Sequence, residues 1–374
     1  MNYVFPTIKT IDDVLPHIEG REEFFLAQKD HYDVINYQVA YDKTFDMTED
    51  YLGSIIRREC RGIIFDKCGK IISRPFHKFF NLGEKEETRI ENLNMNQKKH
   101  IYHKLDGSMI RPIEVQGEVR LATKMGITDT SIQAEEWLKS QNPMIYDWMC
   151  DMYHKGYTPL YEWISPDNLI VLGYKESDLV LLAVRENFSG RYLRRYEYEY
   201  DGSQVKVYDD ECDNLSEFVN NIRGKKDEEG VIIRFDNGHM LKLKNEWYVR
   251  IHKIKEKFQN DRHIIRSILL NEMDDVISLL DDENRNRIIN LENDFHMALI
   301  SKKNQLYDLY NNVKHLTKKE FAQRVMPTLE NKRDSTYIFY AMDGKSIEDR
   351  LMADIDIMLN NNTKFDELRK YMNF

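Results

Sequence analysis

The chain has 374 residues and a mass of 44.8 kDa, a length that favours two or three domains. Hydrophobic residues make up 41% and charged residues 32%, a composition that excludes an extensively disordered chain. The net charge of −10, from 54 basic and 64 acidic residues, argues against adhesion to nucleic acid over the whole surface but is compatible with a local basic groove.

The sequence shows no feature of a secreted or membrane protein. No run approaches the roughly 18 apolar residues that a membrane span needs, and the first residues lack a basic leader and an apolar signal core. The cysteines are too widely spaced for a zinc ribbon or a disulfide framework: Cys60, Cys68, Cys150 and Cys212. We therefore expect a cytoplasmic protein without membrane contact.

Residues 57–250 alternate short apolar runs with turn residues. Runs rich in β-branched residues predict strands at 61–65, 71–72, 101–102, 110–115, 119–123, 180–184, 231–235 and 240–243. Two glycine-containing turns, 67–70 and 116–118, join neighbouring runs, and residues 131–153 are predicted to form a helix. The pattern predicts a mixed α+β body whose sheets are mostly antiparallel.

The last third of the chain has few residues that end strands or form tight turns. After residue 250 the sequence contains one glycine, Gly344, and one proline, Pro327. A polar run at 281–286 is typical of a turn or a helix start. Apolar residues recur at helical spacing in two stripes that we expect to face a core: Ile265, Ile268 and Leu269, and Phe365, Leu368 and Tyr371. We predict a first domain over 1–255 and an all-helical domain over 256–374.

The first motif that could carry chemistry is Lys104-Leu105-Asp106-Gly107, where a lysine at the end of a predicted strand precedes an acid and a glycine. The lysine amine can act as a nucleophile, Asp106 can fix the loop, and Gly107 lets the chain turn. By itself the motif fits a surface turn with a solvated lysine better than a catalytic site.

Two carboxylates occupy unusual places in predicted strands. Glu162 interrupts the strand-like run Tyr161-Glu162-Trp163-Ile164, which is explained equally well by a buried ion pair and by a carboxylate that binds a sugar hydroxyl or a metal. Glu229 and Gly230 open the strand at 231–235, and an ordinary strand entrance explains them in isolation.

Two lysines lie on one face of the last predicted strand. In His239-Met240-Leu241-Lys242-Leu243-Lys244, the period of two places Lys242 and Lys244 opposite Leu241 and Leu243. Neighbouring ammonium groups repel each other, so a phosphate between them would explain the pair. Exposure of both lysines to solvent is the equally plausible alternative.

The order of these motifs resembles that of the covalent nucleotidyltransferases, namely DNA ligases, RNA ligases and mRNA capping enzymes. The sequence is most similar to the T-even bacteriophage RNA ligase 1 family, over about residues 30–280. The stretches that support this are Glu59-Cys60-Arg61-Gly62-Ile63-Ile64-Phe65, Arg74-Pro75-Phe76-His77-Lys78-Phe79-Phe80-Asn81-Leu82, 182–187 and Glu246-Trp247-Tyr248-Val249. The far C-terminal part matches only in length and helical character.

The resemblance implies a role for each motif residue. Lys104 would be the nucleophile that holds AMP as a reactive phosphoramidate. Glu162 would contact the ribose, Glu229 would position a divalent metal, and Lys242 and Lys244 would bind phosphates as part of the catalytic machinery.

Further residues match family positions at the nucleotide site. Arg61 and Lys78 match positions that engage the ATP phosphates, while Tyr37 and Lys124 match other nucleotide contacts. Asp274 aligns with a family acid that is implicated in metal binding. The expected cofactors are ATP and Mg²⁺, which Mn²⁺ can replace, because the triphosphate and the leaving pyrophosphate need their charge screened.

Two windows of the sequence are basic despite the acidic total. Residues 57–78 carry a net charge of +5 and residues 242–257 a net charge of +4. Both windows contain or adjoin proposed site residues, so they are expected to contact a phosphate backbone in a salt-sensitive way. A solvated basic face is the alternative for either window.

Taken together, the sequence predicts a nucleotidyltransferase (ligase-type) α+β domain followed by a helical domain, acting as an ATP-dependent RNA ligase. Its substrates would be RNA 5′-phosphate and 3′-hydroxyl ends. The glycine-poor tail argues against the oligonucleotide-binding barrel that DNA ligases and capping enzymes carry at this place. The resemblance implies a monomer that repairs nicked tRNA in the cytoplasm of a phage-infected host. DNA ligase or capping activity, and an inactive RNA-binding protein, are the alternatives.

Overall fold

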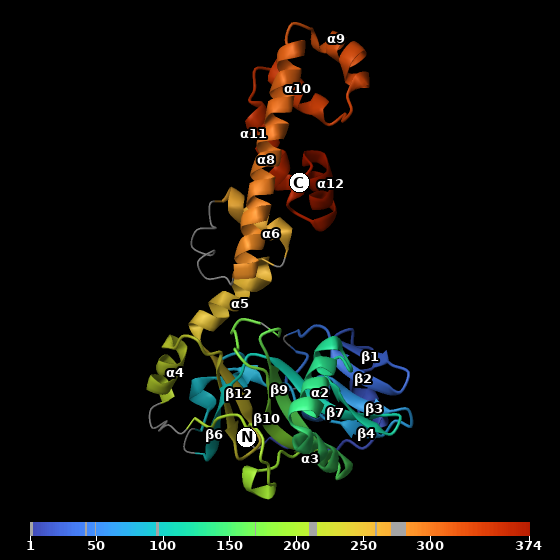
Figure 1. The fold of residues 1–374 in the computed structure, drawn as a ribbon, viewed down its shortest axis with the longest axis vertical. Helices are drawn as coiled ribbons and strands as arrows, with labels where there is room; N and C mark the ends of the chain where they lie inside the picture. Colours follow the sequence, from blue (N-terminus) through green and yellow to red (C-terminus); the bar gives the residue numbers. More distant parts are fainter. Residues whose placement is uncertain are drawn as a thin grey trace. The chain divides into compact units, whose positions relative to one another are not determined.

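The computed structural model divides the chain into two compact units, a first unit of Met1–Arg250 and a second unit of Ile251–Phe374 (Figure 1). Helix α5 (Glu246–Phe258) contains both this division and the boundary predicted after residue 255. The structure describes residues 3–41, 43–48, 50–94, 97–168, 170–208, 215–258, 260–270 and 282–374.

The first sheet is antiparallel and has the strand order β1-β2-β3-β4. Its strands are β1 (Phe24–Gln28), β2 (Tyr32–Tyr37), β3 (Ile63–Asp66) and β4 (Ile71–Ser73). Helix α1 (Tyr51–Glu59) begins at Asp50, whose carboxylate accepts a hydrogen bond from the Gly53 amide, and its Ile56 packs on the sheet. The predicted turn at 67–70 joins β3 to β4, with Gly69 at a positive φ.

The second sheet is antiparallel and has the order β10-β9-β7-β8. Its strands are β7 (Ser108–Val115), β8 (Glu118–Ala122), β9 (Tyr157–Ile164) and β10 (Asp178–Glu186). Two helices, α2 (Asp129–Gln141) and α3 (Pro143–His154), pack on it through a shared apolar core. The single helix predicted over 131–153 is therefore wrong, because Pro143 lacks an amide proton and pushes Asn142 out of helical geometry.

The third sheet places the ends of three strands side by side. Its order is β5-β12-β11-β6, with antiparallel pairs apart from the parallel pair β12 and β5. The strands are β5 (Phe80–Asn81), β6 (Lys99–Lys104), β11 (Gly230–Phe235) and β12 (Met240–Lys244). Helix α4 (Leu215–Gly224) covers the face that carries Val231 and Ile233. The opposite face therefore carries Lys104, Lys242 and Lys244.

The second unit is helical in its described residues. Its helices, apart from the end of α5, are α6 (Asp261–Leu269), α8 (Asp282–Val313), α9 (Lys318–Glu320), α10 (Asp334–Met342), α11 (Ile347–Met358) and α12 (Asn362–Met372), with a π-helical turn at Phe321–Val325. Both predicted stripes belong to one apolar core, as expected. Helix α8 begins within the predicted polar run.

The predicted fold class is confirmed: antiparallel sheets with covering helices precede a helical region. Each predicted strand overlaps an observed one. Short 3₁₀ turns complete the described chain at Ile11–Asp13, Leu15–His17, Glu86–Thr88, Ile90–Asn92, Arg195–Glu197 and Met326–Thr328. Among the described helices, none combines the length and the apolar character that crossing a bilayer requires.

Candidate active site

Glu229 lies between two of the lysines that the sequence singles out. Lys104 Nζ donates to Glu229 Oε2 at 2.7 Å, and Lys244 Nζ forms an ion pair with Oε1 at 2.8 Å. The sheet register causes this, because Gly230 on the central strand β11 is paired with Lys104 on β6 and with Lys244 on β12. A side chain at Gly230 would clash with the Leu243 carbonyl oxygen, so the close approach requires glycine.

Asp106 is a structural carboxylate in the loop that follows Lys104. It is 2% exposed, and its Oδ2 accepts hydrogen bonds from the amides of Val171 and Leu172, each at 2.7 Å. Its Oδ1 accepts a hydrogen bond from the Tyr248 hydroxyl at 2.6 Å. These contacts fix the loop after Lys104 to the β9–β10 connection and to the first turn of α5. Sequence reasoning does not single out Tyr248, which lies within the matching stretch 246–249.

Glu162 faces the same loop from β9. Its Oε1 accepts a hydrogen bond from the Gly107 amide at 3.0 Å, and a Cβ atom on Gly107 would clash with the Trp163 carbonyl oxygen. Burial raises the pKa of Glu162 to about 7, with Lys104 acting against the rise and Glu229 adding to it. The Glu162 carboxylate therefore lies near Lys104 and Glu229, and it changes its charge near neutral pH.

Cations gather around Lys242. Burial, together with the charges of four neighbouring cations, lowers the pKa of its ammonium group to about 8; the cations are Lys78, Lys104, Arg61 and Lys244. Like charges repel when they are held together, so this cluster is arranged for an anion. A solvated, isolated lysine pair is thus not what the structure shows.

Tyr37, at the end of β2 in the first sheet, and Lys124, just after β8 of the second sheet, join the cation cluster. Burial would raise the pKa of the Tyr37 hydroxyl, but the charges of Lys78 and Arg61, with a weaker effect of Lys124, outweigh burial and lower it. Lys78 Nζ lies 5.4 Å from the centre of the Tyr37 ring, within the range of a cation–π contact. Gly62, next to Arg61, packs so closely on the Lys124 backbone that a Cβ atom would lie 2.6 Å from the Lys124 carbonyl oxygen.

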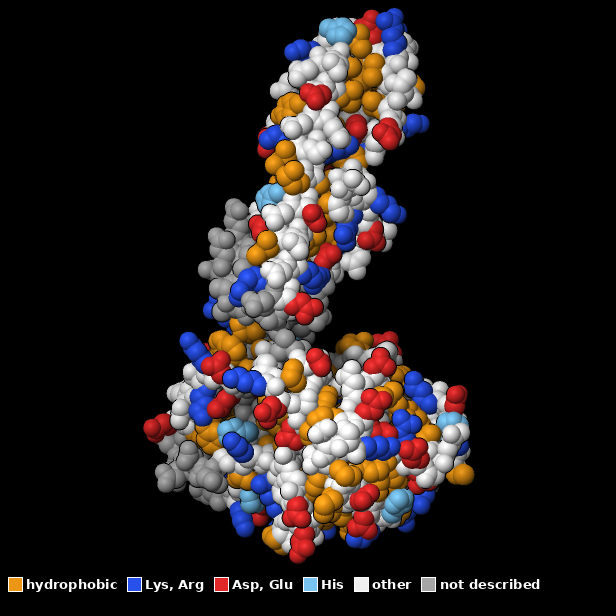
Figure 2. All heavy atoms as spheres, viewed as in Figure 1, with side chains coloured by type: hydrophobic (Ala, Val, Ile, Leu, Met, Phe, Trp, Pro, Cys, Tyr) orange, Lys and Arg blue, Asp and Glu red, His pale blue; other side chains and the backbone are white. Residues whose placement is uncertain are grey.

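Three of the seven basic residues in the window 57–78 are not available to RNA. Arg57, Arg58 and Arg74 are buried, and they pair with Asp50, Glu87 and Glu59, respectively. Their charge is used inside the fold, so the expected contact of this window with a phosphate backbone is wrong for these three residues. On the face of the first unit drawn in Figure 2, basic and acidic side chains are interspersed.

The described acidic residues of the site can supply only some of the ligands of a metal ion. In the described ranges, no group of three or more Asp, Glu, His or Cys side chains could hold a metal ion. Glu229 supplies carboxylate oxygens beside the cation cluster, which suits a hard cation that is also bound by phosphate and water. Asp274, the other predicted metal ligand, lies outside the described residues.

The first unit thus brings together all the described residues that the sequence assigned to a site. They are Tyr37, Arg61, Lys78, Lys104, Lys124, Glu162, Glu229, Lys242 and Lys244. An amine at the edge of a cluster of cations, with carboxylates beside it, can attack a phosphorus atom whose leaving group is polyanionic.

The sequence is similar to those of known RNA ligases. Residues 59–258 match the RNA ligase family of the T4 type. A putative RNA ligase of Thermovibrio ammonificans is 31% identical over 334 residues, which span 86% of each chain. RNA ligase 1 of bacteriophage TS2126 is 28% identical over 148 residues, 36% of each chain. A solved archaeal ATP-dependent RNA ligase has a TM-score of 0.45 and 14% identity, over 75% of this chain and 74% of the other. The family match and the similarity over most of the Thermovibrio protein show that this chain belongs to the T4 RNA ligase 1 family of RNA ligases.

Proposed function

We propose that this RNA ligase uses ATP and joins RNA 5′-phosphate and 3′-hydroxyl ends through a covalent lysyl-AMP. The observation that carries the proposal is the position of Lys104, whose amine lies 2.7 Å from Glu229 and beside the cations around Lys242. In the first step the amine nitrogen attacks the α-phosphorus of ATP. A P–N bond forms, the P–O bond to pyrophosphate breaks, and the amine loses a proton.

The surrounding residues bind different parts of the nucleotide. Lys242 and Lys244, with Arg61 and Lys78, bind the phosphates and stabilise the charge that builds up on the leaving pyrophosphate. Glu162 accepts hydrogen bonds from the ribose hydroxyls when it is ionised. Tyr37, from the first sheet, and Lys124, from the loop after β8, complete the nucleotide site.

A divalent metal, Mg²⁺ or Mn²⁺, would be held by Glu229, and when bound it would screen the triphosphate charge. Glu229 accepts a hydrogen bond from the Lys104 ammonium group and forms an ion pair with Lys244, so its carboxylate is already oriented toward the reacting amine. Lys104 and Lys244 stay close to the phosphates because the sheet register fixes both of them.

The next two steps use the same pocket. AMP passes from Lys104 to the RNA 5′-phosphate, which forms a 5′–5′ phosphoanhydride and restores the lysine amine. The RNA 3′-hydroxyl then attacks the 5′-phosphorus, forms the 3′–5′ phosphodiester and releases AMP. The natural substrate we propose is a nicked tRNA in a phage-infected cell, bound by a monomer whose helical second unit contacts the tRNA.

Transfer of label from ATP tests the first step. Purified protein is incubated with Mg²⁺ and α-labelled ATP or GTP and run on a denaturing gel. Mass spectrometry first establishes that Lys104 does not already carry AMP. We expect label from ATP on the wild type and none on Lys104→Ala. Lys139→Ala should retain the label, because Lys139 pairs with Glu118 and Glu135 on the outer side of the second sheet.

The acceptor is identified in a second assay. Sealing of a 5′-phosphorylated RNA, and of the matching DNA, separates an RNA ligase from a DNA ligase. Absence of label on unmodified wild-type protein would contradict the lysyl-AMP mechanism, and label from GTP alone would indicate capping chemistry.

A further inference from the structure

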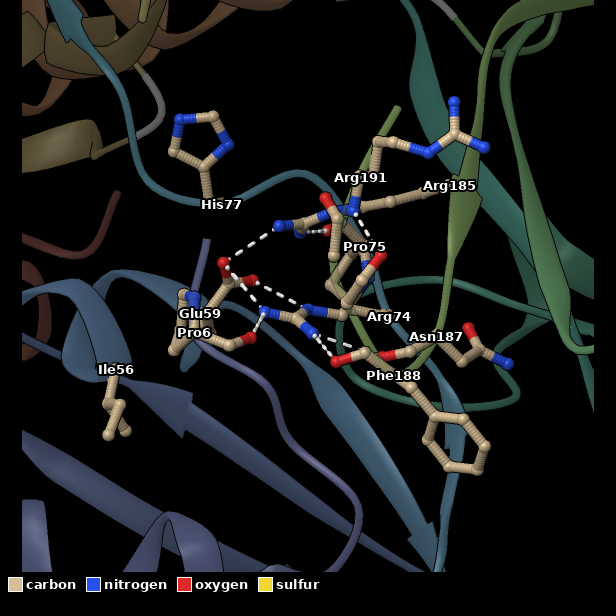
Figure 3. Close-up of polar contacts among 12 residues, drawn as sticks. Pro6, Ile56, Glu59, Arg74, Pro75, His77, Arg185, Asn187, Phe188 and Arg191 are labelled. Carbon is tan, nitrogen blue, oxygen red and sulfur yellow. Dashed lines mark hydrogen bonds and ion pairs between the residues drawn. The ribbon is translucent and has the colours of Figure 1, made fainter. Parts of the chain in front are cut away.

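A buried carboxylate, Glu59, lies between two buried arginines from distant parts of the chain (Figure 3). Arg185 Nη2 donates to Glu59 Oε1 at 2.7 Å, and Arg74 Nε donates to Oε2 at 3.2 Å. The three side chains are at most 1% exposed. Burial would raise the pKa of Glu59, but Arg185 and Arg74 outweigh burial and lower it, so the carboxylate is ionised.

The two guanidinium groups also fasten the backbone around them. Arg74 and Arg185 donate their other N–H groups to carbonyl oxygens in three separate segments of the first unit. The acceptors belong to Pro6, Pro75, Asn187, Phe188 and Gly190. One carboxylate with two arginines therefore connects the N-terminal segment, the chain after β4 and the end of β10.

The cluster lies next in sequence to two proposed phosphate-binding residues. Glu59 ends α1 and precedes Arg61 by two residues, while Arg74 precedes Lys78 by four. The Lys78 amide also donates to the Arg58 carbonyl oxygen at 2.6 Å, so the two segments are joined directly. Movement of either segment would change where Arg61 and Lys78 present their charges.

The same carboxylate connects the phosphate side of the site to the ribose side. Arg185 belongs to β10, where it is paired with Thr158 of β9. Strand β9 carries Glu162 a few residues further on. Glu59 thus fastens the segment of Arg61 to the sheet that positions Glu162.

Buried ion clusters of this kind rarely add net stability over an apolar core, so their use has to be sought elsewhere. Arg61 and Lys78 are held close to Lys242, where cations repel each other, and a rigid support is needed to keep them there without an anion. Building on the ATP site proposed above, we propose that Glu59 is a positioning residue that holds Arg61 and Lys78 where the triphosphate binds.

Equilibrium binding of Mg²⁺-ATP and of adenosine, both measured by titration calorimetry, tests this role. Glu59→Gln keeps the shape of the side chain and removes its charge. We expect the dissociation constant for ATP to rise about tenfold and that for adenosine to change less than about twofold, since only the phosphate contacts depend on the cluster. A general loss of structure would raise the dissociation constants of both ligands together.

Glu135→Gln is the matched control. Glu135 is also buried, and it pairs with Arg120 at 2.8 Å and with Lys139 at 2.9 Å on α2 and β8. This variant should lower the melting temperature and leave both dissociation constants unchanged. Should Glu59→Gln fail to fold, Arg185→Lys is the second variant, because it keeps the positive charge and removes the forked guanidinium contact. It is also expected to weaken the binding of ATP more than the binding of adenosine.

Wild-type affinity for ATP in Glu59→Gln, or a parallel loss of ATP and adenosine, would overturn the positioning role. Failure of the wild-type protein to bind ATP is a distinct result, because it would overturn the proposed nucleotide site and, with it, this role for Glu59.

Discussion

Lys242 should take up a proton when ATP binds. Burial and the charges of Lys78, Lys104, Arg61 and Lys244 lower its pKa to about 8 in the free protein. The triphosphate brings negative charge next to the ammonium group and raises the pKa again. Because the bound form holds the proton more tightly, the affinity for ATP should fall as the pH rises through 8.

The size of the effect follows from that pKa. At pH 8 about half of the Lys242 side chains are neutral, so Lys242 should take up about half a proton per ATP, against about a tenth at pH 7 and about nine tenths at pH 9. Through Lys242 the dissociation constant should rise about tenfold between pH 7 and pH 9, which corresponds to about 1.4 kcal/mol; Glu162, whose ionised form binds the ribose, acts in the opposite direction around pH 7.

Titration calorimetry in two buffers of different ionisation enthalpy counts the protons taken up. Lys242→Arg is the informative variant, because arginine keeps its charge throughout this pH range. The variant should bind ATP with heats that no longer depend on the buffer at pH 8. Wild-type heats that do not depend on the buffer, or an unchanged dependence in Lys242→Arg, would refute the reasoning.

Three other variants test separate parts of the site. Glu162→Gln should flatten the pH dependence of adenylylation near pH 7, because the wild-type carboxyl, with a pKa of about 7, ionises as the pH rises and then binds the ribose; an unchanged rate profile would contradict this. Gly107→Ala should lower the unfolding free energy in urea titrations by about 1–3 kcal/mol, because its Cβ clashes with the Trp163 carbonyl oxygen; wild-type stability would contradict the clash. Arg57→Ala should lower the unfolding free energy by about 1–3 kcal/mol, because it leaves buried acceptors unpaired. It should not change the salt dependence of RNA binding, and a shallower salt dependence would show that Arg57 contacts RNA.

The sequence predicted the part of the site that depends on strand geometry. Alternation along the last strand placed Lys242 and Lys244 on one face, and the end of a strand placed Lys104 beside a turn. Strand pairing brings Lys104 and Lys244 to Glu229, in agreement with the order of the motifs. Local periodicity is enough for such predictions, because one sheet face collects every second residue.

Contacts between distant segments could not be predicted from a single sequence. Arg185 reaches Glu59 across 126 positions, and Tyr248 reaches Asp106 across 142. The net charge of the window 57–78 includes Arg74, although this side chain is buried. A local count of basic residues does not distinguish a buried guanidinium group from a solvated one. The break at Pro143 could have been predicted from proline stereochemistry.

The central position of Gly230 has a consequence for the synthesis of the chain. Lys104 on β6 acquires its neighbours only when β11 and β12 pair beside it, more than a hundred residues later. A chain emerging from the ribosome therefore lacks the partner strand β11 of β6 until residue 235 is free to fold, and Glu229 lacks Lys244 until β12 follows. The proposed site is thus completed only at the end of translation of the first unit, when the last strand joins the sheet.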